Sequence, residues 1–234
     1  MKIVFSGNAI WQLVSQSDTM TWMVYIILLL MSIGCWTIFL YKLVSWRIWN
    51  RSIKVALAHI KAADSIEDLV QISSKLSNTI PGYFLSRSLA QTKQLTGPNR
   101  KQLSDQKYDY LRDMQDQLID SIVQQERSYL SFLSVSASIA PLLGLYGTIW
   151  GLIHAFIDIS KKQAADITVV APGVAEALMA TLESLIIALP ALAMYHYLFN
   201  RVIKIEQQLM TLSDYFLGVM QRLYWSHDTH ENGE

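Results

Sequence analysis

The stretch "VVAPGVAEALMATLESLIIALPALAMY", from Val169 to Tyr195, is apolar enough to cross a lipid bilayer, yet it contains two carboxylates, Glu176 and Glu183. An ionised carboxylate near the centre of a bilayer costs roughly 2.5–3.5 kcal/mol on insertion scales. No Lys or Arg within the stretch can neutralise these acids. Each glutamate must therefore be protonated, face water, or meet a partner from another chain.

The composition of the whole chain favours a membrane protein. Hydrophobic residues make up 52% of the 234 residues and charged residues only 16%, whereas a soluble domain is about 25% charged. Three windows contain no Lys, Arg or Asp, and only the third contains Glu: 19–41, 128–157 and 167–200. Each exceeds the roughly 20 residues that a membrane helix needs. We therefore predict an all-α membrane protein with three transmembrane helices, in preference to a soluble protein with buried core helices.

The distribution of basic residues predicts the orientation. Of the 19 Lys and Arg residues, 13 lie between Lys42 and Arg127, and such residues stay preferentially in the cytoplasm. The N-terminus is therefore expected outside and the C-terminus inside the cell. The expected segments are an outer N-terminal segment (1–20), a first transmembrane helix (21–43), a cytoplasmic helical region (44–131), a second transmembrane helix (132–157), an outer hairpin (158–168), a third transmembrane helix (169–198), and a cytoplasmic C-terminal helix and tail (199–234).

Helical spacing of apolar residues continues beyond the second and third spans into the cytoplasmic segments. A helix from about residue 100 to about residue 157 would be on the order of 85 Å long. We expect the third span to continue past Arg201 with an amphipathic seam formed by Ile205, Leu209, Leu212 and Phe216.

Small side chains recur at helical spacing in the second and third spans. In lipid there is little hydrophobic drive between helices, so small residues that allow close backbone approach supply the packing contact. Close packing is expected at Gly144, Gly147, Gly151, Ala177, Ser184 and Ala188. Three prolines are expected to shape these helices, namely Pro141, Pro172 and Pro190.

Four polar side chains in these spans are candidates for an ion path. Thr148 and Thr181 lie within the small-residue strips, where each hydroxyl could either bond its own backbone or face a narrow hydrated lumen. Glu176 and Glu183 are only about 20° apart around one helix, on a face offset from the threonines. Acids inside a membrane assembly usually mark an ion path. We interpret the set as a cation pathway, with protons as the favoured ion.

Other chemistry is not indicated by the sequence. No nucleophile elbow, phosphate loop or metal-ligand spacing is present, and Cys35 is the single cysteine. The formal net charge of zero gives no reason to expect nucleic acid as a partner. We therefore expect no enzymatic activity, no metal and no cofactor.

Two further features remain open to two interpretations. His154, near the outer end of the second span, could relay protons or serve as an interfacial packing residue. An acidic stripe could be an ordinary solvated helix face, or could line a cation exit or dock a basic partner. It consists of Asp105, Asp109, Asp113, Asp116 and Asp120.

The segments "PLLGLYGTIWGLIHAFI" (141–157) and "VVAPGVAEALMATLESLIIALPA" (169–191) resemble the TolQ/ExbB proton-channel family, which is related to the flagellar MotA subunit. The family patterns GLxGTVxG and APGxAEALxATxxGLxxAIPA are matched at Gly144, Leu145, Gly147, Thr148, Gly151, Ala171, Pro172, Gly173, Ala175, Glu176, Ala177, Leu178, Ala180, Thr181, Leu185, Ala188, Pro190 and Ala191. The "HAFI" ending and the short outer N-terminus are more similar to the TolQ branch than to the ExbB branch.

This resemblance implies a homo-oligomeric ring, expected to be a pentamer, in the bacterial inner membrane. The ring would surround single-span helices of a TolR/ExbD-type partner, whose aspartate carries protons. Thr148 and Thr181 would line the pore, and Glu176 would lie at its outer side. The complex would energise a TolA- or TonB-like envelope-spanning protein; a self-sufficient cation channel is the other possibility. The chain departs from the family pattern at Glu183-Ser184, where the pattern has a small or apolar residue followed by glycine.

Overall fold

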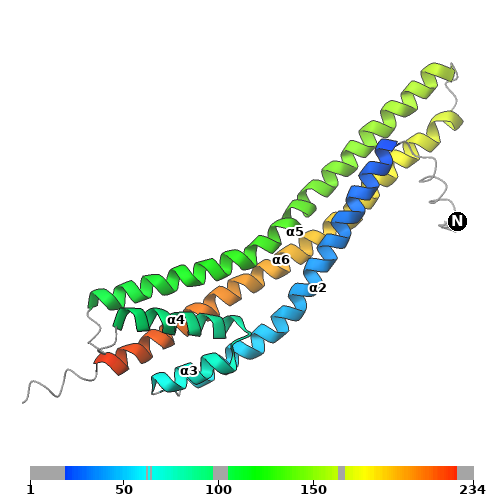
Figure 1. Cartoon of the computed structure of the whole chain (residues 1–234). Helices are drawn as coiled ribbons and strands as arrows, with labels where there is room; N and C mark the ends of the chain where they lie inside the picture. The colour runs from blue at the N-terminus through cyan, green and yellow to red at the C-terminus, as the bar shows by residue number, and fades with distance from the viewer. Residues whose placement is uncertain (1–18, 62, 64, 97–104, 163–166, 226–234) are drawn as a thin grey trace, which may run out of the picture. The chain divides into compact units, whose positions relative to one another are not determined.

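A computed structural model describes residues 19–61, 63, 65–96, 105–162 and 167–225. The predicted outer N-terminal segment lies almost entirely outside this range. The described residues form helices α2 (Thr19–Lys61), α3 (Ile66–Lys75), α4 (Ile80–Thr96), α5 (Asp105–Lys162) and α6 (Ile167–Trp225), labelled as in Figure 1. They include no β-strand. Helices α2, α5 and α6 are each long and apolar enough to cross a membrane. The predicted all-α membrane fold is therefore confirmed.

Helices α5 and α6 extend further than the predicted spans. Residues 158–162, assigned to an outer hairpin, continue α5, and α6 already begins at Ile167. Pro141 lies inside α5, and Pro172 and Pro190 lie inside α6, without ending either helix.

The helices divide into two compact units. The first unit contains residues 19–40 of α2, 129–162 of α5 and 167–198 of α6. The second unit contains the remainder of these three helices together with α3 and α4.

The three segments of the first unit lie side by side (Figure 1). Val24 and Leu28 of α2 form a buried cluster with Ala140 of α5 and Ala188 of α6. On another part of α2, a Cβ at Gly34 would lie only 2.6 Å from the Phe132 ring of α5. The absence of a side chain at Gly34 therefore lets α2 approach α5 closely.

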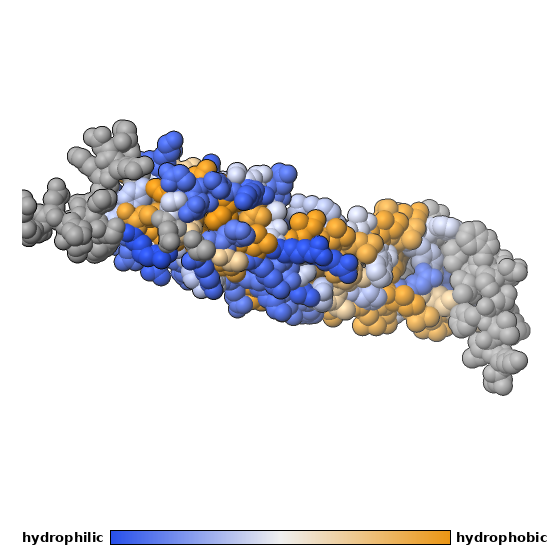
Figure 2. Space-filling model, turned by 90° about the horizontal axis from the view of Figure 1, so that it is seen from below, coloured by the Kyte–Doolittle hydropathy of each residue, from blue (hydrophilic) through white to orange (hydrophobic). Residues whose placement is uncertain are grey.

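Most of the apolar surface of the first unit faces outward. Only 17% of the apolar window of α2 and 33% of those of α5 and α6 are buried. On the face visible in Figure 2, hydrophobic surface is prominent over the first unit, whereas hydrophilic surface dominates the second. Lipid can cover such apolar side chains without a free-energy cost, as expected for membrane-spanning helices.

In the second unit, local signals define the short helices α3 and α4. The Ser65 side chain accepts a hydrogen bond of 3.2 Å from the backbone N–H of Asp68 and caps α3. Pro81 lies in the first turn of α4, where its missing N–H is tolerated. A Cβ at Gly82 would lie 1.9 Å from the carbonyl oxygen of Leu76, so the turn between α3 and α4 requires glycine.

The longer helices of the second unit are joined by an apolar core and by polar cross-links. On α6, the seam residues Ile205, Leu209, Leu212 and Phe216 are all buried. Lys42 of α2 forms an ion pair of 2.6 Å with Glu126 of α5, and the two side chains are only 8% and 18% exposed. The indole N–H of Trp49 donates to Gln208, and Arg127 pairs with Glu206 at 2.9 Å.

Candidate functional site

Helices α5 and α6 of the first unit meet along a seam of small residues. A Cβ at Gly144 would lie 2.7 Å from Ser184 Cβ, at Gly147 3.0 Å from Ala180 Cβ, and at Gly151 2.8 Å from Ala177 Cβ. As α5 advances from 144 to 151, the contacted residues on α6 move back from 184 to 177, so the helices are antiparallel. Each distance is shorter than an ordinary carbon contact. The glycines therefore set the separation of the two helices.

Thr181 makes a polar contact across this seam. Its Oγ1 donates a hydrogen bond of 3.2 Å to the carbonyl oxygen of Gly144. Ser184, which is fully buried, donates through its Oγ to the carbonyl of Thr181 at 2.8 Å. The close approach permitted by Gly144 brings its carbonyl within reach of the Thr181 hydroxyl.

Thr148 is placed differently. Its Oγ1 donates to the carbonyl of Leu145 in its own helix at 2.7 Å. This is the backbone-bonded arrangement that the sequence left open for both threonines. The side chain is half-buried, and the hydroxyl oxygen still has capacity to accept a hydrogen bond.

The two glutamates lie on the opposite edge of the packed face of α6 from Thr181. Ala177, Ala180 and Ser184 form the buried centre of that face, and both glutamates are half-buried beside it. The ring contact of 6.1 Å between Phe39 of α2 and Tyr197 of α6 sets the register of these helices, and about four helical turns further toward the N-termini Tyr25 and Glu183 lie at the same level. The two ion pairs found among the described residues both lie in the second unit, and neither involves these acids. The structure thus directs Thr181 toward α5 and leaves the glutamates on the other edge of the packed face of α6.

Tyr25 is the residue of this site that sequence reasoning missed. It is a half-buried tyrosine within the first apolar span. The sequence does show a tyrosine inside a membrane helix. Residue spacing along α2 alone does not show which residues of α6 lie at the same level as this tyrosine.

His154 belongs to an aromatic row on α5. Its Nδ1 lies 3.1 Å from the carbonyl oxygen of Trp150, and the two rings are 4.8 Å apart. The Trp150 ring in turn stacks on Tyr146. These contacts agree with packing and leave a relay role for His154 without direct support.

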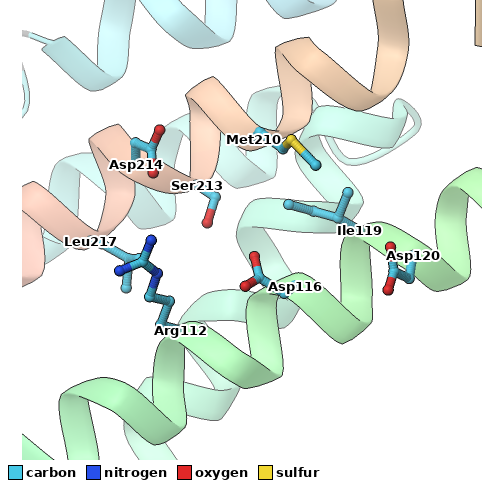
Figure 3. Close-up of a pocket in the computed structure, with 8 residues that line it drawn as sticks. All are labelled: Arg112, Asp116, Ile119, Asp120, Met210, Ser213, Asp214 and Leu217. Atoms are coloured by element: carbon cyan, nitrogen blue, oxygen red, sulfur yellow. The ribbon is translucent and has the colours of Figure 1, made fainter. Parts of the chain in front are cut away.

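The acidic stripe lies in the second unit. The described members Asp109, Asp113, Asp116 and Asp120 are exposed, and the Asp105 side chain lies outside the described residues. Asp116 and Asp120 line a cavity of about 300 Å³ between α5 and α6. Figure 3 shows Arg112 and Asp116 projecting from α5 toward α6, which contributes Ser213 and Asp214. In the described part of the chain, no group of three or more His, Cys, Asp or Glu side chains could hold a metal ion.

Comparison with known proteins identifies the family of the chain. A family model described as the MotA/TolQ/ExbB proton channel family matches residues 76–211, more than half of the chain. The chain therefore belongs to the MotA/TolQ/ExbB proton channel family.

Curated relatives of two kinds are similar to the chain. Biopolymer transport protein ExbB of Pseudomonas putida is 27% identical over 212 residues, which cover 91% of this chain and 63% of that protein. Tol-Pal system protein TolQ of Haemophilus influenzae is 38% identical over 108 residues, covering 46% of this chain and 47% of the relative. ExbB of Neisseria meningitidis is 30% identical over 192 residues, covering 79% and 84%. The matches thus span less than two thirds of the first two relatives.

The three apolar helices and these relatives together identify a multi-pass protein of the bacterial inner membrane.

Proposed function

We propose that the chain is a proton-channel subunit of a motor driven by the proton-motive force, of the TolQ type in a Tol-Pal cell-envelope system that serves cell division. The observation that carries the proposal is the polar crossing of Thr181 onto the Gly144 carbonyl within a glycine seam of a chain that belongs to a proton channel family. A buried hydroxyl at this seam can exchange hydrogen bonds with water or with a carboxyl group of another chain.

In the proposed mechanism, this chain performs no covalent chemistry. A ring of identical subunits, a pentamer in our proposal, encloses the single-span helices of a TolR/ExbD-type partner. Protons pass between ring and partner, and a partner aspartate is alternately charged and neutralised. Each proton that crosses 100 mV releases about 2.3 kcal/mol. A few protons would therefore bias a conformational equilibrium strongly enough to move a TolA-like envelope-spanning protein.

The site residues have separate roles in this proposal. Thr148 and Thr181 line the pore, Glu176 lies toward its outer side, and Glu183 supplies a second protonatable group on the edge of α6 opposite Thr181. The orientation that this requires, with an outer N-terminus and a cytoplasmic C-terminus, rests on the basic residues that follow the first span.

An ExbB-type subunit that energises TonB-dependent uptake is the second candidate. It is favoured by the ExbB relatives, which match 91% and 79% of this chain, whereas the TolQ relative matches 46%. The TolQ type is favoured by the resemblance of the "HAFI" ending of the second span, His154–Ile157, to the TolQ branch. Purification of the chain from membranes, followed by identification of the single-span, aspartate-bearing protein that accompanies it, distinguishes the two.

Thr181→Ala tests the channel assignment. We expect this variant to assemble normally, because one hydrogen bond contributes only about 1 kcal/mol, but to lose proton-driven function. The matched control is Thr37→Ala, which removes the same hydroxyl from an exposed site on α2, where it bonds its own helix at Ile33. Proton uptake by liposomes containing the co-purified complex, and envelope integrity of the cells, are the measurements. Full coupling in Thr181→Ala would exclude a pore role for this residue.

Two further measurements test the remaining assignments. Glu183→Gln should alter proton-driven function, and unchanged function would show that Glu183 has no obligatory part in proton transfer. Liposomes that contain this chain alone should be proton-tight, because the proposed carrier belongs to the partner. A leak through the chain alone would instead favour a self-sufficient cation channel.

A further inference from the structure

Tyr25 lies at the edge of the face of α2 that packs within the first unit. Its neighbours Val24 and Leu28 are only 4% and 2% exposed and contact the cluster containing Ala188 of α6. Tyr25 itself is half-buried. Its ring therefore borders the buried cluster that joins α2 to both α5 and α6, and is not directed wholly at lipid.

Two independent contacts fix the register between α2 and α6. The rings of Phe39 and Tyr197 are 6.1 Å apart, and nearer the helix N-termini Leu28 clusters with Ala188. The helices are therefore parallel over this length. About four helical turns toward the N-terminus from Phe39 and from Tyr197, the two helices reach Tyr25 and Glu183 at the same level.

The chemistry at this level makes the phenol important. The described side chains of residues 20–40, 129–157 and 171–198 include no Lys or Arg. An ionised Glu183 therefore has no Lys or Arg among these described residues to stabilise it. A tyrosine hydroxyl can donate one hydrogen bond, and donation to a carboxylate is about twice as strong as a hydrogen bond between neutral groups. Glu176, the other acid of α6 in this unit, lies two turns further toward the N-terminus of the helix.

We propose that Tyr25 is a positioning residue for Glu183: when Glu183 ionises, the Tyr25 hydroxyl turns to donate its carboxylate a hydrogen bond that the described structure does not contain, and holds it on the α2 side of α6, away from Thr181. The proton path would then have a second protonatable position inside each subunit, beside the threonine-lined path. The use of this pair in transport rests on the proposed function, whereas the pairing itself does not. Tyr25 keeps its own proton throughout, because phenols ionise only near pH 10.

Carbodiimide labelling of the complex in native membranes tests the pair, since a hydrophobic carbodiimide reacts with protonated carboxyl groups. Tyr25→Phe removes only the hydroxyl, so the ionised form of Glu183 loses its hydrogen-bond donor. The protonated form is then favoured, and Glu183 is protonated for a larger fraction of the time. We expect Glu183 to be labelled roughly tenfold faster at neutral pH in this variant than in the wild type, as loss of a charge-assisted hydrogen bond implies. Mass spectrometry of the peptide that contains Glu183 gives the rate.

Tyr146→Phe is the matched control, because it removes the same hydroxyl from an aromatic row on α5. It should leave the labelling of Glu183 unchanged. Equal labelling rates in Tyr25→Phe, Tyr146→Phe and the wild type would overturn the pairing. If Glu183 is not labelled in any of them, a double-mutant cycle tests the pairing, with the free energy of unfolding in detergent as the measured quantity. Tyr25→Phe should then destabilise the wild type but have little effect in a Glu183→Leu background, and additive effects would refute the contact.

The labelling result and the proposed function can fail separately. Faster labelling in Tyr25→Phe, together with full proton-driven function in Thr181→Ala, would keep the pair and reject the threonine-lined path. Unchanged labelling together with loss of function in Thr181→Ala would reject the pair alone.

Discussion

Gly144→Ala is the most direct test of the helix seam. The added Cβ would lie 2.0 Å from Ser184 Oγ, 2.7 Å from Ser184 Cβ and 3.1 Å from Thr181 Cα. The serine oxygen could rotate away, but the other two atoms are fixed to the backbone of α6. The two helices must therefore separate by about 1 Å to restore ordinary carbon contacts.

Two effects then add. Overpacking in a well-packed contact costs about 1–3 kcal/mol, and the lengthened Thr181–Gly144 hydrogen bond costs about 1 kcal/mol more. We expect Gly144→Ala to lower the free energy of unfolding by about 2–4 kcal/mol. Steric-trapping or SDS titration of the purified chain in micelles measures this quantity.

The chain offers both a rescue and a control. Ser184→Gly removes the two closest atoms, so the double variant Gly144→Ala/Ser184→Gly should recover most of the lost stability. Gly218→Ala, in a helical site with no atom within 4 Å, should instead stabilise by about 0.5–1 kcal/mol because alanine favours helix. If Gly144→Ala were as stable as the wild type, or if Ser184→Gly gave no rescue, the close contact would be wrong.

Two other substitutions have defined outcomes. Lys42→Met should lower the free energy of unfolding by about 3 kcal/mol, because it leaves Glu126 largely buried without its cation. The double variant Lys42→Met/Glu126→Leu should recover stability in the same titration. An equal loss of stability in both variants would count against the ion pair. Thr148→Val should change the free energy of unfolding by less than about 0.5 kcal/mol, because the Thr148 hydroxyl bonds only its own helix. Loss of proton uptake in this stable variant would then show a role in the lumen. A large loss of stability would contradict the described hydrogen bond.

The sequence predicted which kinds of residue form the contact between α5 and α6, but not which residue of one helix lies opposite which residue of the other. Small residues at helical spacing identified the contact faces of α5 and α6, because only such residues allow close approach in lipid. Spacing along one helix does not determine the level at which it meets the next. The bond from Thr181 to the Gly144 carbonyl therefore required coordinates, as did the pairing of Gly147 with Ala180.

The environment of the glutamates was less accessible from sequence. The span of α2 is apolar on all sides, so its periodicity does not show which face packs against the other helices. Sequence reasoning placed the glutamates on a face of α6 offset from the threonines, but could not show which helix that face approaches, and did not consider Tyr25. The structure shows Thr181 bonded to α5, and the register between α2 and α6 places Glu183 at the level of Tyr25.

This separation bears on why a single chain would be an incomplete channel. Apolar side chains such as Leu178, Ile186 and Leu189 are more than 60% exposed on α6 and can remain in lipid without a penalty. Half-buried Glu176 and Glu183 cannot, because a carboxylate in contact with acyl chains is costly. Tyr25 supplies one donor, whereas an ionised carboxylate can accept about four hydrogen bonds. Two such acids therefore need water or polar groups from beyond this chain, and a ring that encloses a hydrated gap around another polypeptide would supply both.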